Sequence, residues 1–150
     1  MTLAVKKNLG NWGETQVDLY LAKHGFIPIV KNKFFRGGEI DRIYVSKTKH
    51  QCCIAEIKTI SCSPKTSLSF YFGTYCSNYL VKPRQLSNLR FTAETYQNIF
   101  RCHTDIYIRF FVVFVCHRRQ LEIAESCYQM FGGKILCHNK SFCIASFDPN

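Results

Sequence analysis

The fold is decided by the stretch Gly38–Ile60, which reads GEIDRIYVSKTKHQCCIAEIKTI. Two mostly apolar runs, Glu39–Val45 and Cys52–Ile60, flank a polar connection, Lys47–Gln51. This order is typical of two strands joined by a hairpin turn. The strands of a hairpin lie side by side in one sheet, so we expect residues of the two runs to come close together.

Each of these runs contains an acidic residue, Asp41 in the first and Glu56 in the second. Burial of a carboxylate without a partner costs on the order of several kcal/mol in lost solvation. The two acids are therefore not expected to lie in apolar runs by chance. Alternate residues of a strand share a face, so Lys58 points the same way as Glu56. An exposed Glu56–Lys58 ion pair with Asp41 at a turn is one interpretation. The other is a site in which both acids hold a divalent cation such as Mg²⁺, which takes oxygen ligands.

The sequence before this stretch predicts a helix and a strand. Residues 13–23 show the apolar spacing of a helix with one buried stripe. Glu14 lies three residues before Val17 of that stripe, so we expect it to project from the buried edge of the helix. Phe26–Val30 is a short apolar strand, and the basic segment Lys31–Gly38 is predicted to be a bend.

The sequence after it predicts a second helix and a central strand. Pro83 suits the first position of a helix, and apolar residues recur at helical spacing up to Phe100. Ile106–Cys116 is nearly all apolar, as expected of a strand covered on both faces. The pattern assigns no structure to the aromatic segment Phe70–Tyr79 or to Leu121–Met130, and stacking on bases, core packing and a dimer surface all remain open for the former.

Length and charge restrict the class of protein. The 150 residues suit one domain, and the net charge of +10 is typical of proteins that bind polyanions such as nucleic acids. A membrane surface is the rival polyanion, but the run Ile106–Cys116 contains Arg109 and is too short to span a bilayer. The N-terminus lacks the pattern of a secretory signal. We therefore expect a cytoplasmic protein without a membrane partner.

The nine cysteines do not change this expectation. Their number is odd, several lie in apolar runs, and reduced thiols are the default without a secretory signal. Cys-His pairs occur at Cys102, Cys116 and Cys137, but the sequence has no CxxC pair of the kind that presents two thiolates to one zinc ion. The spacing therefore argues against zinc.

The motif in the central stretch resembles a known signature. Gly38-Glu39-Ile40-Asp41, followed after fourteen residues by Glu56-Ile57-Lys58, resembles the PD-(D/E)xK nuclease motif, with Ile40 in place of its proline. The wider sequence is similar to the YraN family of endonuclease-like proteins, which are similar in turn to Holliday junction resolvases. The other matching positions lie roughly between residues 10 and 113: Gly13-Glu14, Tyr20-Leu21, Gly25-Phe26, Asn32, Lys82 and Arg109-Phe110.

This resemblance implies a fold and a site. The fold is α/β, a single domain over residues 1–150 with a restriction-endonuclease-like core, a mixed sheet of about four strands flanked by helices. A Cys-rich C-terminal extension from about residue 118 matches poorly. The implied catalytic residues are Glu14, Asp41, Glu56, Lys58 and Gln85. Asp41 and Glu56 are implied ligands of Mg²⁺, with Mn²⁺ as a substitute. Ile57, which lies between Glu56 and Lys58, is implied to bind the same metal.

The basic residues complete the hypothesis. A solvated surface is their ordinary interpretation, but a group of them is placed to neutralise DNA phosphates: Lys31, Lys33, Arg36, Lys82 and Arg84. We therefore predict a metal-dependent endonuclease that hydrolyses DNA phosphodiester bonds. Branched and single-stranded DNA are candidate substrates, and a homodimer remains open. The alternatives are a catalytically inert nucleic-acid-binding module of the same fold and a protein-interaction or effector domain.

Overall fold

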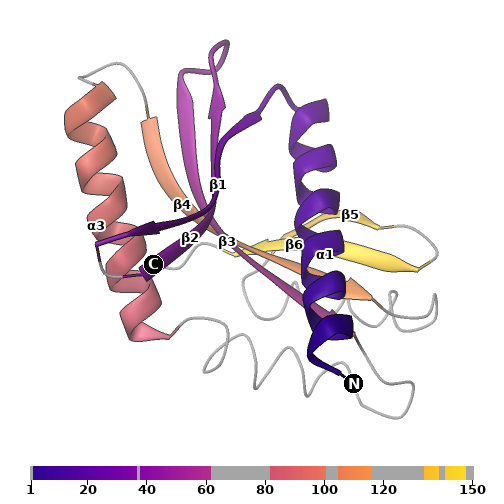
Figure 1. The fold of residues 1–150 in the computed structure, drawn as a ribbon. Coiled ribbons are helices and arrows are strands. Elements are labelled where there is room, and N and C mark those ends of the chain that lie inside the picture. Colours follow the sequence, from indigo (N-terminus) through magenta and orange to yellow (C-terminus); the bar gives the residue numbers. More distant parts are fainter. Residues whose placement is uncertain are drawn as a thin grey trace.

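The computed structural model describes residues 2–36, 38–61, 82–100, 105–115, 134–138 and 141–147. These residues form a mixed α/β fold in which two helices pack against one sheet (Figure 1). The elements follow the order α1 (Leu3–Lys23), β1 (Ile27–Phe35), β2 (Gly38–Ser46), β3 (Gln51–Ser61), α3 (Pro83–Phe100), β4 (Asp105–Val115), β5 (Lys134–His138) and β6 (Phe142–Phe147).

The sheet has six strands in the order β1-β2-β3-β4-β6-β5. The first three are antiparallel neighbours, whereas β3 and β4 are parallel and are connected through α3, since parallel strands need a crossover. The expected central strand is confirmed, because β4 lies between β3 and β6. The expectation of about four strands is wrong: β6 pairs antiparallel with β4, and β5 extends the sheet. These pairings cover the edge that an apolar β4 would otherwise expose.

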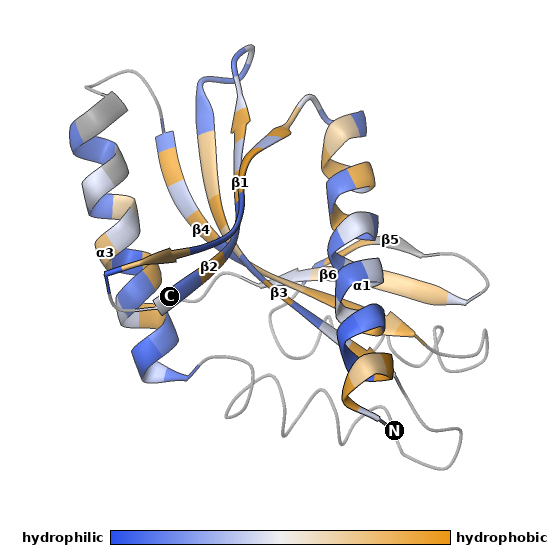
Figure 2. Ribbon diagram, viewed as in Figure 1, coloured by the Kyte–Doolittle hydropathy of each residue, from blue (hydrophilic) through white to orange (hydrophobic). Residues whose placement is uncertain are grey.

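The two faces of the sheet carry two separate cores. Val17 and Leu21 of α1 pack on one face, and Leu89 of α3 packs on the other. Along β3 the side chains alternate: Cys53, Ala55 and Ile57 belong to the α1 side, and Cys52 and Ile54 to the α3 side. Figure 2 shows hydrophilic and hydrophobic residues interleaved along both helices, as expected when one side of a helix faces a sheet.

The boundaries of two predicted elements change. The predicted helix over residues 13–23 begins earlier, at Leu3, where the Thr2 hydroxyl accepts the Val5 N–H at 3.3 Å as an N-cap. Residues 3–8 are exposed, so no buried stripe marks this first part in the sequence. The predicted bend over Lys31–Gly38 is wrong as well, because β1 continues to Phe35, which pairs with Gly38 of β2.

The remaining expectations are partly tested. The helix from Pro83 to Phe100 is confirmed as α3, and the side chains of Cys52, Cys53 and Cys143 are buried. The segments Phe70–Tyr79 and Leu121–Met130 lie outside the described residues. Over the described part of the chain, no helix combines the length and the apolar character needed to cross a membrane.

Candidate active site

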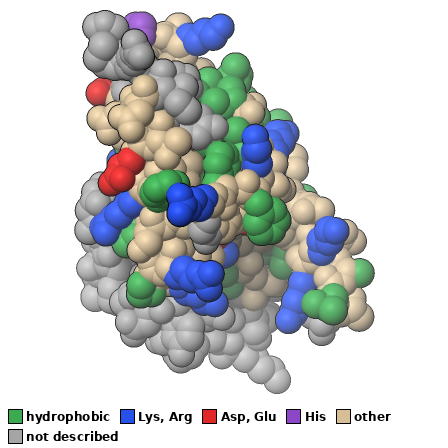
Figure 3. All heavy atoms as spheres, turned by 60° about the vertical axis from the view of Figure 1, so that its left-hand side comes forward, with side chains coloured by type: hydrophobic (Ala, Val, Ile, Leu, Met, Phe, Trp, Pro, Cys, Tyr) green, Lys and Arg blue, Asp and Glu red, His purple; other side chains and the backbone are tan. Residues whose placement is uncertain are grey.

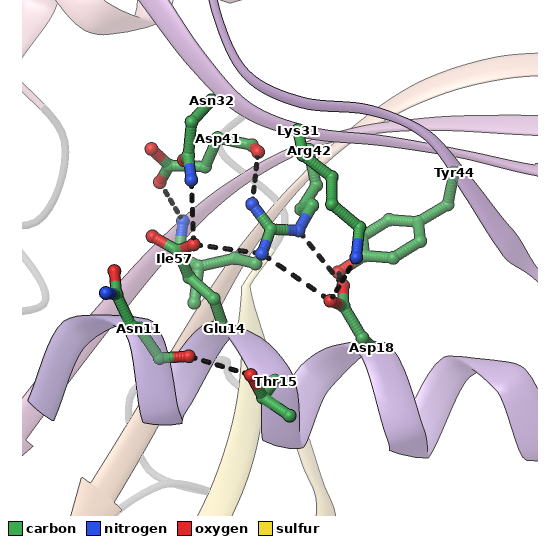
Figure 4. Close-up of polar contacts among 10 residues, drawn as sticks. All are labelled: Asn11, Glu14, Thr15, Asp18, Lys31, Asn32, Asp41, Arg42, Tyr44 and Ile57. Carbon is green, nitrogen blue, oxygen red and sulfur yellow. Dashed lines mark hydrogen bonds and ion pairs between the residues drawn. The ribbon is translucent and has the colours of Figure 1, made fainter. Parts of the chain in front are cut away.

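The site forms where β2 and β3 separate. The paired residues of these strands end at Arg42 and Ala55. Further along, the backbone N–H of Ile57 donates to Asp41 Oδ2 at 2.7 Å (Figure 4). The carboxylate therefore takes the place that a backbone carbonyl has in a regular ladder, and it is held at the point where the two strands diverge.

Glu56 is the second acid of the site and is almost completely buried, with 3% of its surface exposed. Its Oε1 atom lies 2.6 Å from Lys58 Nζ and accepts a hydrogen bond from Gln85 Nε2 at 3.1 Å. Gln85 comes from the first turn of α3, so a helix and a strand together orient the carboxylate. The predicted Glu56–Lys58 pair is therefore present, but it is not the exposed surface pair of the simpler interpretation.

These side chains line one pocket of about 380 Å³, a volume within the usual range for ligand sites. The lining residues are Gly38, Glu39, Asp41, Glu56, Lys58, Lys82, Arg84, Gln85 and Asn88. Four of the five predicted catalytic residues and two of the five predicted phosphate contacts are among them. The structure thus brings together acids from β2 and β3, a lysine from β3 and cations from the start of α3.

The electrostatics of the pocket are dominated by two neighbouring carboxylates. Burial, followed by the negative charge of Glu56, raises the pKa of Asp41 to about 7, although the Ile57 hydrogen bond and Lys58 act in the opposite direction. Burial disfavours the Lys58 ammonium, but the charge and hydrogen bond of Glu56, together with the charges of Asp41 and Glu14, outweigh this effect and raise the pKa of Lys58. Because these carboxylates repel each other, additional positive charge in the pocket is favourable.

The raised pKa of Asp41 predicts a pH dependence of stability. Between about pH 4 and pH 7 the folded state holds a proton on Asp41 that the unfolded state has lost, so stability should fall as pH rises through this range. The variant Asp41→Asn cannot titrate, but its amide oxygen can still accept the Ile57 N–H. Urea unfolding of both proteins at several pH values should show a flatter profile for the variant, and identical slopes would contradict the assignment.

Glu14 does not line this pocket but lies beside it on α1. Its Oε2 atom is 2.9 Å from Arg42 Nη2 and accepts a hydrogen bond from Asn32 Nδ2 at 3.1 Å (Figure 4). Arg42, only 5% exposed, also donates from Nη1 to the backbone carbonyl of Asp41 at 2.8 Å. Glu14 is therefore connected to the pocket through the backbone of Asp41.

Arg42 is the centre of a polar network that includes a second acid of α1. Its Nε atom donates to Asp18 Oδ1 at 3.1 Å, and the Tyr44 hydroxyl donates to the same oxygen at 2.6 Å. None of these three residues was among the predicted site residues. Signals for two of them were present: Arg42 is an arginine inside an apolar strand, and Asp18 is an acid four residues after Glu14 on the same helix face.

The predicted phosphate contacts fall into three groups. Lys31 lies 3.5 Å from Asp18 and belongs to the network. Lys33 and Arg36 are exposed at the end of the β1–β2 hairpin, and Lys82 and Arg84 line the pocket. Figure 3, which faces the α3 side, shows Lys and Arg side chains spread over this surface with few acidic ones between them.

The donor set of the pocket fits a hydrated divalent cation. Mg²⁺ is usually held by one or two carboxylates and keeps several waters, and hydrogen bonds from described residues reach neither Asp41 Oδ1 nor Glu56 Oε2. Ile57 can contribute only its backbone carbonyl, because its side chain lies in the α1-side core. The described residues contain no group of three or more His, Cys, Asp or Glu that could hold a metal, so they provide no closed zinc-type site.

Comparison of the chain with protein-family models and with curated proteins finds no match. A functional assignment therefore rests on the residues of the pocket and their geometry.

Proposed function

We propose that this protein is a metal-dependent endonuclease that hydrolyses DNA phosphodiester bonds at the pocket between β2, β3 and α3. The proposal is carried by the convergence of Asp41, Glu56 and Lys58 from two adjacent strands, with Lys58 Nζ 2.6 Å from Glu56 Oε1. Two carboxylates and an ammonium beside a pocket of about 380 Å³ suit metal-assisted hydrolysis of a phosphodiester, because the acids can hold the cation and the ammonium can stabilise negative charge.

Each residue has a distinct role in this proposal. A divalent cation bound to Asp41 and Glu56 would neutralise charge on the phosphate and lower the pKa of the attacking water. The Lys58 ammonium stabilises the negative charge that develops on the phosphate oxygens. Gln85 keeps the Glu56 carboxylate in its orientation. Glu14, fixed by Arg42, supports the position of Asp41 from the other side of the sheet.

The cations at the start of α3 support nucleic acid as the substrate. Lys82 and Arg84 line the same pocket as the acids, and their charges suit the phosphates on either side of a cleaved bond. The net charge of +10 further favours a polyanion. The four strands β1 to β4, with α1 on one face and α3 on the other, agree with the restriction-endonuclease-like core that the sequence resemblance implies.

The burial of the acids disfavours a purely structural ion pair. Glu56 is almost completely enclosed, and Asp41 accepts a hydrogen bond from the neighbouring strand instead of capping a turn. A buried pair is often no more stable than a well-packed apolar pair of similar size. The Asp41 carboxylate adds a third charged group beside this pair, and all three line a pocket. A chemical role explains this arrangement better than a structural one.

The test is incubation with plasmid, branched and single-stranded DNA in the presence of Mg²⁺, Mn²⁺ or EDTA. We expect cleavage with either metal and none with EDTA. Asp41→Asn should abolish cleavage and also the heat of Mn²⁺ binding in a calorimetric titration. Glu94→Gln, the same type of charge change at an exposed position of α3, is the matched control and should behave like the parent protein.

Other outcomes select the alternatives. Salt-sensitive DNA binding without hydrolysis in any metal would support an inert nucleic-acid-binding module. Absence of both DNA binding and Mn²⁺ binding would support a protein-interaction domain. Mn²⁺ binding that is unchanged in Asp41→Asn would reject the proposed metal ligands.

A further inference from the structure

The end of the β1–β2 hairpin is fixed beside the pocket. Figure 1 shows this end of the hairpin running toward α3. Its side chains Phe35 and Ile40 pack in the α3-side core with Leu86 and Leu89. We call the described residues 33–36 and 38–40 the hairpin arm. Gly38 and Glu39 of this arm line the pocket, so the arm forms one of its walls.

Phe34 lies on this arm with its ring in solvent. It is 76% exposed, more than any other aromatic residue in the described part of the chain, whereas its neighbour Phe35 is packed in the core. In the strand register Phe34 pairs directly with Glu39, which lines the pocket. The exposed ring is therefore held one strand away from the proposed site of hydrolysis by a backbone that is anchored on α3.

Cationic residues lie on the same arm and at the pocket, and the Lys33 ammonium lies 5.7 Å from the centre of the neighbouring Phe35 ring. Lys33 and Arg36 are exposed on either side of Phe34 in the chain, and Lys82 and Arg84 lie at the pocket itself. Glu39 is the only acid among the described residues of the arm. A ligand that is both anionic and able to cover an aromatic ring would complement this surface.

We propose that Phe34 stacks on an unpaired base of the nucleic acid bound in the pocket, while Lys33 and Arg36 contact the adjacent phosphates. The identity of the ligand rests on the proposed function. Aromatic rings combined with a cationic surface are the usual means of binding single strands, because every base offers a flat face. The bases of an intact duplex are already stacked on each other. The arm therefore selects DNA with at least one unpaired base beside the cleaved bond.

A second copy of this chain is the competing occupant of the arm. A two-fold symmetric dimer would place the same surface of both copies face to face. Lys33 and Arg36 of both copies would then lie in one interface, and like charges brought together oppose association. Charge complementarity thus favours a polyanion over self-association.

The test uses the full chain in EDTA, so that binding is measured without cleavage. The probes are an oligonucleotide containing 2-aminopurine as a single strand and the same oligonucleotide in an intact duplex. We expect the parent protein to quench the fluorescence of the single strand. Phe34→Ala should remove this quenching and lower single-strand affinity roughly five- to hundredfold, as for loss of one stacked base. Duplex affinity should change by less than about twofold, because the phosphate contacts remain.

Two control variants test whether the effect is due to base stacking by Phe34 or to the loss of any exposed aromatic ring. Phe34→Trp should retain the quenching, since indole stacks as well as phenyl. Phe91→Ala removes another exposed ring, 47% exposed on α3, and should leave both affinities unchanged. Sedimentation of each variant reports its oligomeric state. Because Phe34 is exposed, its substitution should not prevent folding.

The outcomes distinguish this inference from the proposed function. Unchanged single-strand affinity in Phe34→Ala, or an equal loss on duplex and single strand, overturns the stacking role even if the parent cleaves DNA. Dissociation of a dimer without a change in quenching assigns the arm to self-association. The parent protein could also show quenching that depends on Phe34 but cleave no DNA. This result would support base stacking by Phe34 and reject the proposed nuclease activity. A parent that binds neither probe overturns both.

Discussion

Lys58→Ala is expected to lower the cleavage rate roughly a hundred- to thousandfold, the usual cost of losing one group that stabilises transition-state charge. Its effect on DNA affinity should be less than about twofold, because many other cations contribute to electrostatic attraction. The lysine differs from these cations in its position, 2.6 Å from Glu56 Oε1 inside the pocket. Single-turnover kinetics and a binding assay in EDTA measure the two effects separately.

Lys82→Ala provides the matched comparison for this experiment. It removes a cation from the same pocket, but one that the proposal assigns to phosphate binding. Its affinity for DNA should therefore fall, with a smaller effect on the rate at saturating DNA. If Lys58→Ala instead loses affinity and rate in equal measure, Lys58 is a phosphate anchor and does not act on the transition state.

Arg42→Met is expected to lower the free energy of unfolding by about 3–5 kcal/mol, the range found when one partner of a buried ion pair is removed. Methionine fills a similar volume, but it leaves Glu14 and Asp18 without the guanidinium that lies within 3.1 Å of both carboxylates. Urea unfolding at neutral pH measures the change. Arg90→Met, at an exposed position of α3, should stay within about 0.5 kcal/mol of the parent.

The variant Glu14→Gln tests whether Glu14 only stabilises the fold or also positions the site through Arg42. The glutamine retains most of the volume and leaves the contacts between Arg42 and Asp18 in place. If Glu14 supports the site through Arg42, we expect the cleavage rate to fall roughly ten- to a hundredfold, as for the loss of a group that orients a metal ligand. A variant of lower stability with full specific activity would make Glu14 a structural residue only.

Local patterns in the sequence were sufficient for the central elements. The helix Pro83–Phe100 follows from a proline suited to its first turn and from apolar residues at helical spacing, both of which act within the segment itself. The pairing of β2 with β3 follows from two apolar runs joined by a short polar turn, which allows few other registers. Asp41 and Glu56 could be singled out because an acid in such a run needs a partner.

Tertiary structure alone decided the features that depend on distant partners. β1 continues through the segment Lys31–Phe35 because β2 offers backbone partners there. Backbone hydrogen bonds of this kind are not encoded in side-chain composition. The strands β5 and β6 join the sheet because β4 presents an unpaired edge.

Dependence on distant partners also explains which features of the candidate site could be predicted from the sequence and which could not. The sequence by itself determined which groups are available: two acids and a lysine at strand spacing, and an acid on a helix edge. Whether Glu14 faces the pocket or Arg42 depends on how α1 lies on the sheet, and packing sets this arrangement. Long-range electrostatic pairing is strong only after burial lowers the local dielectric, so the Arg42 network exists only in the folded protein.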